Sequence, residues 1–530
     1  MHVKTMKRTI SATPLILAAM IATALSLAAT AYAAAPGITG PAFNLRAEPA
    51  YITQPDGASI YSWGYGCNVA PAGFAPAAIA NAACPTMQVP GPTLIVTQGQ
   101  SVTVTLTNSL PASAGNTSIL FPGFNVTTSG GVIGPLTQEA VPGGTVTYTF
   151  TATTPGTRAY YSGTQGDLQI EMGLYGAIIV LPSSIPSACT TGIAASNLTA
   201  KAHWGEDDFR LAAAAYNHPK ACYDREYLFQ YSEIDPAIHR KAEEQIALKA
   251  GCSAGVAGCN LSVPTEPYVP AYFLINGRSM PDLMDGNYNY QYPHQPYNGN
   301  PHLHPGELVL LRIIGQGRWQ HPFHEHGNHV RILARDGNLI LSSTNANEQN
   351  LAGPLLFTTT TTPGQAMDGI YYWTGKGLNW DPYGHNPTSA DPSAKLPCTP
   401  DANGYNTGSP TAINYFEWCQ DHNKPLQAAP TGDVASGGPA NLPDPNILAN
   451  GAWFGGSPYL GANATVRAVG STGTTPPSGT VANSPSEEAG FAFMWHSHNE
   501  REITTNNIFP GGAMMMMLVD SREFVIDESK

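Results

Sequence analysis

The chain has 530 residues, and charged residues make up only 12% of it, about half the share of an average soluble domain. It contains 54 glycines and 46 prolines, which favours many short strands joined by turns and excludes a helical bundle as the main architecture. The formal net charge of −13 argues against nucleic acid as a partner.

The N-terminus is typical of an export signal. Residues 1–33 open with three basic side chains, continue in the apolar run 14–29 and end in an Ala-x-Ala pattern at 31–33. No later stretch reaches the ~18 uninterrupted apolar residues that a membrane-spanning helix needs. The sequence therefore predicts a secreted or periplasmic protein that is not an integral membrane protein.

Alternation of apolar and polar residues with a period of two predicts strands at 93–111, 145–157 and 174–182. We expect these strands to form an antiparallel sandwich, and we assign residues 40–185 to a first β domain. The sequence of 186–223 is loop-like and is interpreted as a linker.

A second β domain is expected over 224–525. A short helix is predicted at 236–250, where a proline is followed by good helix formers. The predicted strands that follow are 271–277, 307–315, 329–334, 369–375, 491–498 and 513–520. Between 376 and 488 the chain is dominated by Gly, Pro, Asn, Thr and Ser, and this stretch is too long for an ordinary connection. It is predicted to be an insertion in the second domain.

The eight cysteines form an even set in a chain with an export signal, so disulfides are expected. Spacing alone cannot choose among roughly a hundred connectivities. The pairings between sequence neighbours would be Cys67/Cys84, Cys189/Cys222, Cys252/Cys259 and Cys398/Cys419. No cysteine has zinc-finger spacing, which argues against a thiolate-bound structural metal.

Histidines cluster in two short windows, HPFHEHG at 321–327 and WHSH at 495–498. Residues two apart in a strand project from one face, so each window supplies a same-face pair. If the two strands are neighbours, four imidazoles converge. Several imidazoles without a thiolate favour copper or zinc. The candidate metal ligands are His321, His324, His326, His496 and His498.

The alternative is that these are ordinary strand histidines, hydrogen-bonded within a polar seam. His321 lies beyond the Pro322 kink, where it could share the opposite face with Ser497 and line a second pocket. Glu502 is either a weak ligand beside His321 or, more commonly for a loop carboxylate, a solvated side chain. His302 and His304 form a third pair, interpreted as a copper entry or relay site or as surface-loop histidines.

The segment HPFHEHG at 321–327 resembles the multicopper oxidases, whose cupredoxin domains carry HPxHxHG and, near the C-terminus, HCHxxxHxxxxM. Segments 89–108, 155–180, 273–282 and 306–327 resemble family segments in family order. The resemblance implies an all-β fold of two tandem cupredoxin-like Greek-key β-sandwich domains. It also implies a copper ion as ligand, and two-domain relatives imply a homotrimer with metal between subunits.

The departures from the family pattern matter for chemistry. The first-domain HWHG aligns on residues 120–123, and WYHSH aligns on 159–163, where Tyr161 and Gly163 replace histidines. In the second domain Ser497 replaces the cysteine of HCH, and Glu502 replaces the next histidine. A blue copper needs a thiolate with two histidines, and only half the ligands of the family's trinuclear cluster remain. We expect one copper, or two with water and a carboxylate completing the shell, and zinc is the other candidate ion.

Three functions are compatible with this pattern. The first is an exported copper-binding protein without a blue-copper centre, with a role in metal binding or altered redox chemistry. The second is an unconventional copper-dependent oxidoreductase acting on phenols or metal ions, since a conventional laccase mechanism is not expected. The third is an extracellular structural or adhesion protein on a vestigial cupredoxin scaffold.

Overall fold

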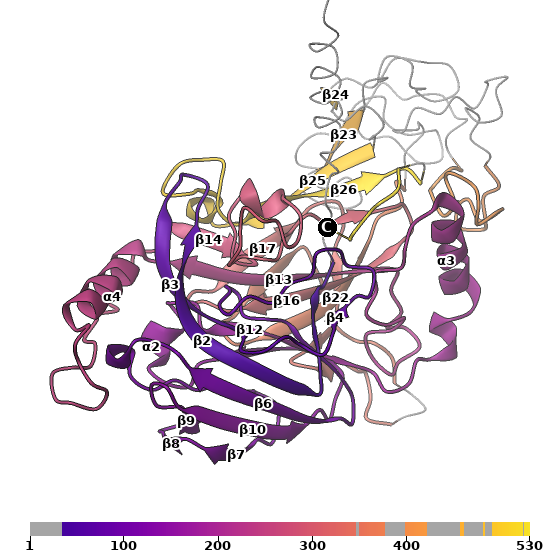
Figure 1. Cartoon of the computed structure of the whole chain (residues 1–530). Coiled ribbons are helices and arrows are strands. Elements are labelled where there is room, and N and C mark those ends of the chain that lie inside the picture. The colour runs from indigo at the N-terminus through magenta and orange to yellow at the C-terminus, as the bar shows by residue number, and fades with distance from the viewer. Residues whose placement is uncertain are drawn as a thin grey trace, which may run out of the picture.

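The computed structural model describes residues 34–345, 349–376, 398–420, 456–460, 481–482, 490–522 and 524–529. The predicted signal peptide, 1–33, and much of the predicted insertion lie outside the described residues. Among the described residues, no helix is long and apolar enough to cross a membrane. The chain is mostly β, as predicted, with its strands arranged in several sheets (Figure 1).

Two five-stranded sheets, here called the N-terminal sheets, have the strand orders β11-β12-β5-β1-β4 and β3-β2-β6-β10-β7, and β8 pairs separately with β9. Their strands are β1 (Gly37–Thr39), β2 (Ala42–Thr53), β3 (Ser59–Cys67), β4 (Phe74–Ala75), β5 (Leu94–Thr97), β6 (Ser101–Asn108), β7 (Thr127–Gly130), β8 (Val132–Ile133), β9 (Gln138–Glu139), β10 (Thr145–Thr151), β11 (Gly156–Tyr161) and β12 (Tyr175–Leu181).

Two seven-stranded sheets, the C-terminal sheets, have the orders β14-β13-β16-β22-β18-β19 with β20 on β18, and β15-β26-β25-β17-β21 with β23 on β25 and β24 on β23. Their strands are β13 (Arg225–Ile234), β14 (Tyr272–Ile275), β15 (His302–Leu303), β16 (Leu308–Gly315), β17 (His321–Glu325), β18 (Val330–Arg335), β19 (Asn338–Leu339), β20 (Leu355–Leu356), β21 (Thr358–Thr361), β22 (Ala366–Tyr372), β23 (Gly456–Leu460), β24 (Val481–Ala482), β25 (Gly490–Ser497) and β26 (Met514–Asp520).

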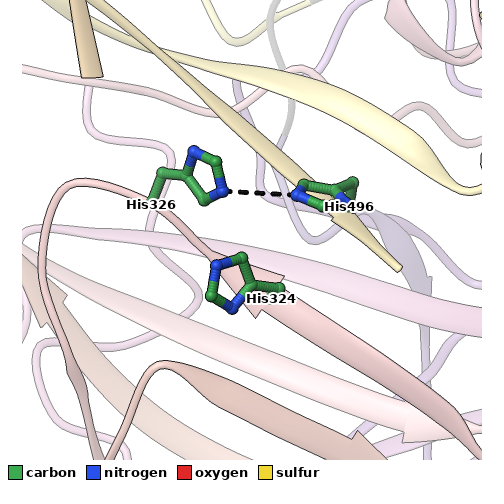
Figure 2. A group of neighbouring side chains, drawn as sticks. All are labelled: His324, His326 and His496. Atoms are coloured by element: carbon green, nitrogen blue, oxygen red, sulfur yellow. Dashed lines mark hydrogen bonds between the residues drawn. The ribbon is translucent and has the colours of Figure 1, made fainter. Parts of the chain in front are cut away.

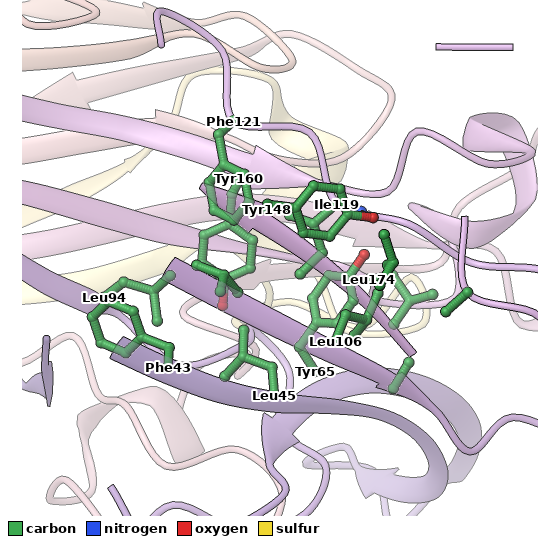
Figure 3. Packing of buried hydrophobic residues seen from close by; sticks show 14 of the residues in the cluster. Phe43, Leu45, Tyr65, Leu94, Leu106, Ile119, Phe121, Tyr148, Tyr160 and Leu174 are labelled. Atoms are coloured by element: carbon green, nitrogen blue, oxygen red, sulfur yellow. The ribbon is translucent and has the colours of Figure 1, made fainter. Parts of the chain in front are cut away.

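Period-two patterning explains how the N-terminal sheets close on a core. In β6, Val102, Val104 and Leu106 are fully buried while the threonines between them face outward, as expected for a strand with one buried face. Aromatic side chains fill the space between the sheets, and Tyr148 and Tyr160 pack there with aliphatic neighbours (Figure 3). A second core lies between the C-terminal sheets, built around Phe229, Phe323, Trp495, Met515 and Met517.

The helices are short: η1 (Ala112–Ala114), α2 (Gly166–Gln169), η2 (Ser187–Cys189), α3 (Gly192–Trp204), α4 (Pro236–Leu248), η3 (Asp282–Met284) and η7 (Glu500–Ile503). Helix α4 lies where the sequence predicts a helix. Helix α3 lies inside 186–223, which was interpreted as a loop-like linker, so the loop interpretation of those residues is wrong. The side chain at its N-cap, Thr191, makes no capping hydrogen bond, and the usual start signal is therefore weak.

The aromatic and polar tract at 287–298 packs between the two groups of sheets. Gln295 accepts the backbone N–H of Thr53 at 2.9 Å, and the Tyr297 hydroxyl accepts the N–H of Thr93 at 3.1 Å. The Val89 N–H donates to the carbonyl of His294 at 2.8 Å. The tract is therefore a structured loop that joins the C-terminal half of the chain to the N-terminal sheets.

All four disulfides between sequence neighbours are present, with Cα–Cα distances from 5.0 to 5.8 Å. No cysteine is free. The expected pairing is confirmed, and part of the predicted insertion, 398–420, is closed by the bond between Cys398 and Cys419.

Candidate metal centre

The two histidine windows lie on neighbouring antiparallel strands. In β17 and β25, His324 is the direct register partner of His496. His326 and His498 follow one residue beyond the described ends of these strands. Because residues two apart share a face, this pairing brings both His-x-His pairs to the same side of the sheet.

Four of the five predicted ligands come together, and we call His324, His326, His496 and His498 the histidine cluster. One ring nitrogen from each of His324, His326 and His496 lies within 4.8 Å of the others. The Nε2 atoms of His326 and His496 are 3.2 Å apart (Figure 2). The His498 ring centroid lies 4.6 Å from that of His324 and 5.6 Å from that of His496.

Two neighbouring oxygens orient these rings. Nδ1 of His324 is hydrogen-bonded to the Thr358 hydroxyl at 2.8 Å, and Nδ1 of His496 to the carbonyl of Ser497 at 2.7 Å. Contacts of this kind fix the tautomer and the orientation of metal-binding imidazoles. Thr358 carries no motif, and it comes close only because β21 pairs with β17.

His324 and His496 in the histidine cluster are held as neutral imidazoles, and one ring of the cluster, His498, is exposed to solvent. Burial, followed by the nearby rings of His326, His498 and His496, lowers the pKa of His324 to about 3. Burial also lowers the pKa of His496. His324 and His496 are buried, whereas His326 is half-buried and His498 is exposed. The neutral ring is the form that binds metal, so these two rings need lose no proton at neutral pH.

His321, the fifth predicted ligand, does not join the cluster. It is fully buried, and both of its ring nitrogens contact carboxylates: Nδ1 lies 2.8 Å from Glu502 Oε2 and Nε2 lies 2.9 Å from Glu233 Oε2. Ser497 is on the same face and donates its hydroxyl to Glu502 at 2.5 Å. The second pocket suggested by the sequence is therefore filled by side chains. Glu502 is buried rather than solvated, and the solvated interpretation is wrong.

The third histidine pair is also buried, so its interpretation as surface-loop histidines is wrong. Nδ1 of His302 lies 2.6 Å from Asp520 Oδ2, and Nε2 of His304 lies 2.5 Å from Glu206 Oε1. Each ring thus has its own carboxylate partner. Glu206 and Asp520 are distant in the sequence, and no local signal marks them as partners.

Comparison with known families relates two segments of this mostly β chain to copper oxidases. Two family models, both described as multicopper oxidase, match residues 78–184 and 264–372. The two matched segments, one in each group of sheets, are therefore similar to multicopper oxidase domains. A comparison with curated proteins finds no match.

Solved structures with a similar fold include copper proteins. One is the multicopper oxidase mgLAC, with 14% identity, a TM-score of 0.44, and coverage of 90% of this chain and 86% of the other. The blue copper oxidase from Nitrosomonas europaea has 15% identity and a TM-score of 0.43, over 90% and 85%. The copper nitrite reductase from Nitrosomonas europaea has 18% identity and a TM-score of 0.35, over 63% and 84%.

Proposed function

We propose that this chain is an exported copper-binding protein whose metal is held by His324, His326, His496 and His498, without a blue-copper centre. The observation that carries the proposal is the direct pairing of His324 with His496, which brings both His-x-His pairs to one side of a sheet. Three of the four rings already present nitrogens within 4.8 Å of one another. One copper ion, or two with further oxygen ligands, fits this donor set.

The donor chemistry favours copper, and zinc is the second candidate. Neutral imidazole suits both ions, and divalent copper binds a given nitrogen site more tightly than zinc does. No thiolate can contribute, because all eight cysteines are in disulfides. Ser497 stands between His496 and His498, and its hydroxyl binds Glu502 rather than facing the cluster. A site of this kind would lack the copper–thiolate bond of blue-copper centres.

The loss of ligands from the first domain is supported by packing. The backbone of Leu120 pairs with that of Tyr161, their N–H and carbonyl groups 2.7 Å apart. A Cβ added at Gly163 would lie 2.8 Å from Leu120 Cγ, closer than real Cβ contacts allow. An imidazole at position 163 would need this apolar contact to move. The C-terminal sheets therefore supply all the proposed ligands.

Export and assembly are part of the same proposal. Four disulfides are typical of proteins that mature in an oxidising compartment, which supports a secreted or periplasmic location. The homotrimer implied by two-domain relatives is testable by light scattering on the purified protein.

The decisive experiment is copper loading of the purified protein, followed by metal analysis with optical and electron paramagnetic resonance spectra. We expect about one or two copper ions per chain, a nitrogen-ligand spectrum, and no intense band near about 600 nm. His324→Ala should weaken copper binding by more than ~100-fold, because loss of an outer contact alone costs 10–100-fold.

The matched control is His203→Ala, because His203 is exposed on α3, away from β17 and β25. This variant should bind copper as the wild type does. An intense blue band, or a wild-type protein that binds no copper in stoichiometric amounts, would contradict the proposal.

The exposure of His498 favours a second candidate, an unconventional copper-dependent oxidoreductase. A ligand on the surface allows a small reductant to reach the metal without an internal electron carrier. Oxygen uptake with phenols or ferrous ion that is lost in His324→Ala would support this activity, and copper binding without oxygen uptake would leave metal binding as the function.

A further inference from the structure

The two strands that carry the cluster are also connected on their opposite face. Ser497 lies between His496 and His498, and its hydroxyl donates to Glu502 Oε2 at 2.5 Å. The same oxygen lies 2.8 Å from Nδ1 of His321, which lies in β17 three residues before His324. The three side chains are fully buried. We call Ser497, Glu502 and His321 the buried link, because they join β25 to β17 through side chains.

The buried link is anchored on a third strand. Nε2 of His321 lies 2.9 Å from Glu233 Oε2, in β13. The other oxygen of Glu233 accepts the backbone N–H groups of Arg318 and Trp319 at 2.5 and 2.8 Å. The Tyr268 hydroxyl donates to it at 3.1 Å. Glu233 therefore contacts both β17 and the loop before it, one through each carboxylate oxygen.

His321 therefore carries a positive charge. Glu502 accepts from Ser497 and, at 3.0 Å, from the Asn499 amide, so His321 lies between two carboxylates that are both acceptors. An imidazole that donates from both nitrogens is the protonated form. Burial lowers the pKa of His321, but the hydrogen bonds and charges of Glu233 and Glu502 outweigh burial and raise that pKa to about 9. A ring that donates from both nitrogens has no lone pair left for a metal.

Backbone pairing alone gives the cluster limited support. The ladder between β17 and β25 has only three register pairs: Phe323 with Ser497, His324 with His496, and Glu325 with Trp495. His326 lies just beyond these pairs, and one further backbone bond joins His498 to β17, from its N–H to the Pro322 carbonyl at 2.8 Å. A charge-assisted hydrogen bond is shorter and stronger than a neutral one, so a charged link on the opposite face restricts how far the two strands can shift or rotate.

We propose that His321 and Ser497, acting through Glu502, are positioning residues that set the geometry of the histidine cluster. The inference rests on the proposed function, because it assigns these residues a role toward the metal held by the cluster. A positioning role also explains why a charged group is buried here. A buried charge pair adds little to stability, but it can favour one arrangement of the strands over others.

The test compares Ser497→Ala, His321→Gln and Ser497→Thr with the wild type, by copper titration and electron paramagnetic resonance of the complete exported chain. Ser497→Ala and His321→Gln should weaken copper binding by about 10–100-fold, the usual effect of removing a contact behind the ligands. Both should alter the copper hyperfine splitting. Ser497→Thr keeps the hydroxyl and should restore affinity and spectrum.

Tyr148→Phe is the matched control, because it removes a buried hydroxyl that accepts the Ile119 N–H at 3.0 Å in the core of the N-terminal sheets, and it contacts no residue of the buried link. It should lower the melting temperature and leave the copper spectrum unchanged, which separates positioning from stability. Ser497→Ala removes only one oxygen atom, so this variant should fold. It therefore tests the proposal even if His321→Gln does not fold.

The outcomes distinguish the two proposals. If the wild type binds copper, and Ser497→Ala leaves affinity and spectrum unchanged, the positioning role is overturned and the proposed function stands. If the wild type binds no copper, both are overturned.

Discussion

Glu325 lies between His324 and His326, and its side chain points to the opposite face of β17, as its position in the strand predicts. It is fully buried, and the Thr359 hydroxyl donates to Oε1 at 2.5 Å. Burial is the main reason why its pKa rises to about 8, well above the ordinary 4.5. The folded protein therefore holds a proton on Glu325 at neutral pH.

Because the folded protein holds this proton more tightly than the unfolded chain does, its free energy of unfolding should depend on pH. The unfolded chain releases the proton near pH 4.5 and the folded chain near pH 8, so the contribution is complete below pH 4.5 and is lost as the pH rises through 8. In the wild type the free energy of unfolding should fall between pH 5 and pH 9. In Glu325→Gln this fall should be smaller by about 2–5 kcal/mol. Urea titrations of the metal-free protein at these pH values measure it.

His321 loses stabilisation over an overlapping range, from about pH 6.5 to 9, so the difference between wild type and variant isolates Glu325. Glu244→Gln, at an exposed position of α4, should keep the wild-type slope. An unchanged slope in Glu325→Gln would show that the carboxyl group is ionised in the folded state.

At the scale of elements, α4 connects the two groups of sheets. It follows β13 of the C-terminal sheets directly, yet Ile238 and Ala242 pack into the core of the N-terminal sheets. Asp235 caps its N-terminus, with Oδ1 accepting the N–H of Ala237 at 2.9 Å and Oδ2 that of Val269 at 2.8 Å. One carboxylate thus holds both the helix and the chain that returns to β14.

Asp235→Ala should lower the free energy of unfolding by about 1–3 kcal/mol, because it leaves a helix N–H and a loop N–H without their acceptor. Asp235→Asn keeps one oxygen and should recover part of the loss. Denaturant unfolding of the two variants tests the prediction, and equal stability of Asp235→Ala and wild type would contradict it.

At the scale of the whole molecule, a buried polar contact joins the N-terminal and C-terminal sheets. Asp368 of β22 accepts the N–H and the hydroxyl of Thr157 in β11, at 3.1 and 2.6 Å, and the Tyr216 hydroxyl also binds it. Arg312 lies 3.7 Å from the same carboxylate and donates to the Thr157 hydroxyl at 2.9 Å.

Asp368→Ala should destabilise the folded protein by about 3–5 kcal/mol, because removing one member of a buried charge network leaves the others uncompensated. Calorimetry should show a lower melting temperature. The exposed Asp207→Ala is the control, with an expected change within about 0.5 kcal/mol. Equal melting temperatures for the two variants would show that this contact does not hold the sheets together.

Much of the fold was predictable, because it follows from local chemistry. The period-two pattern of 101–108 identified β6, and the proline and good helix formers from 236 onward identified α4. The disulfide partners are neighbours along the chain. Helix α3 was missed because its first residue is glycine, a poor helix former, and its N-cap side chain makes no capping hydrogen bond. The export signal and the domain boundaries stay predictions.

For the site, strand geometry by itself determined that His324 and His326 share a face, as do His496 and His498, because side chains alternate along any strand. Only the tertiary structure decided that β17 pairs with β25, more than a hundred residues away, and that His321 meets Glu233 and Glu502 instead of a metal. Local periodicity fixes the direction of a side chain, but its partner is chosen by the packing of distant strands. No pattern within one segment of the sequence encodes that choice.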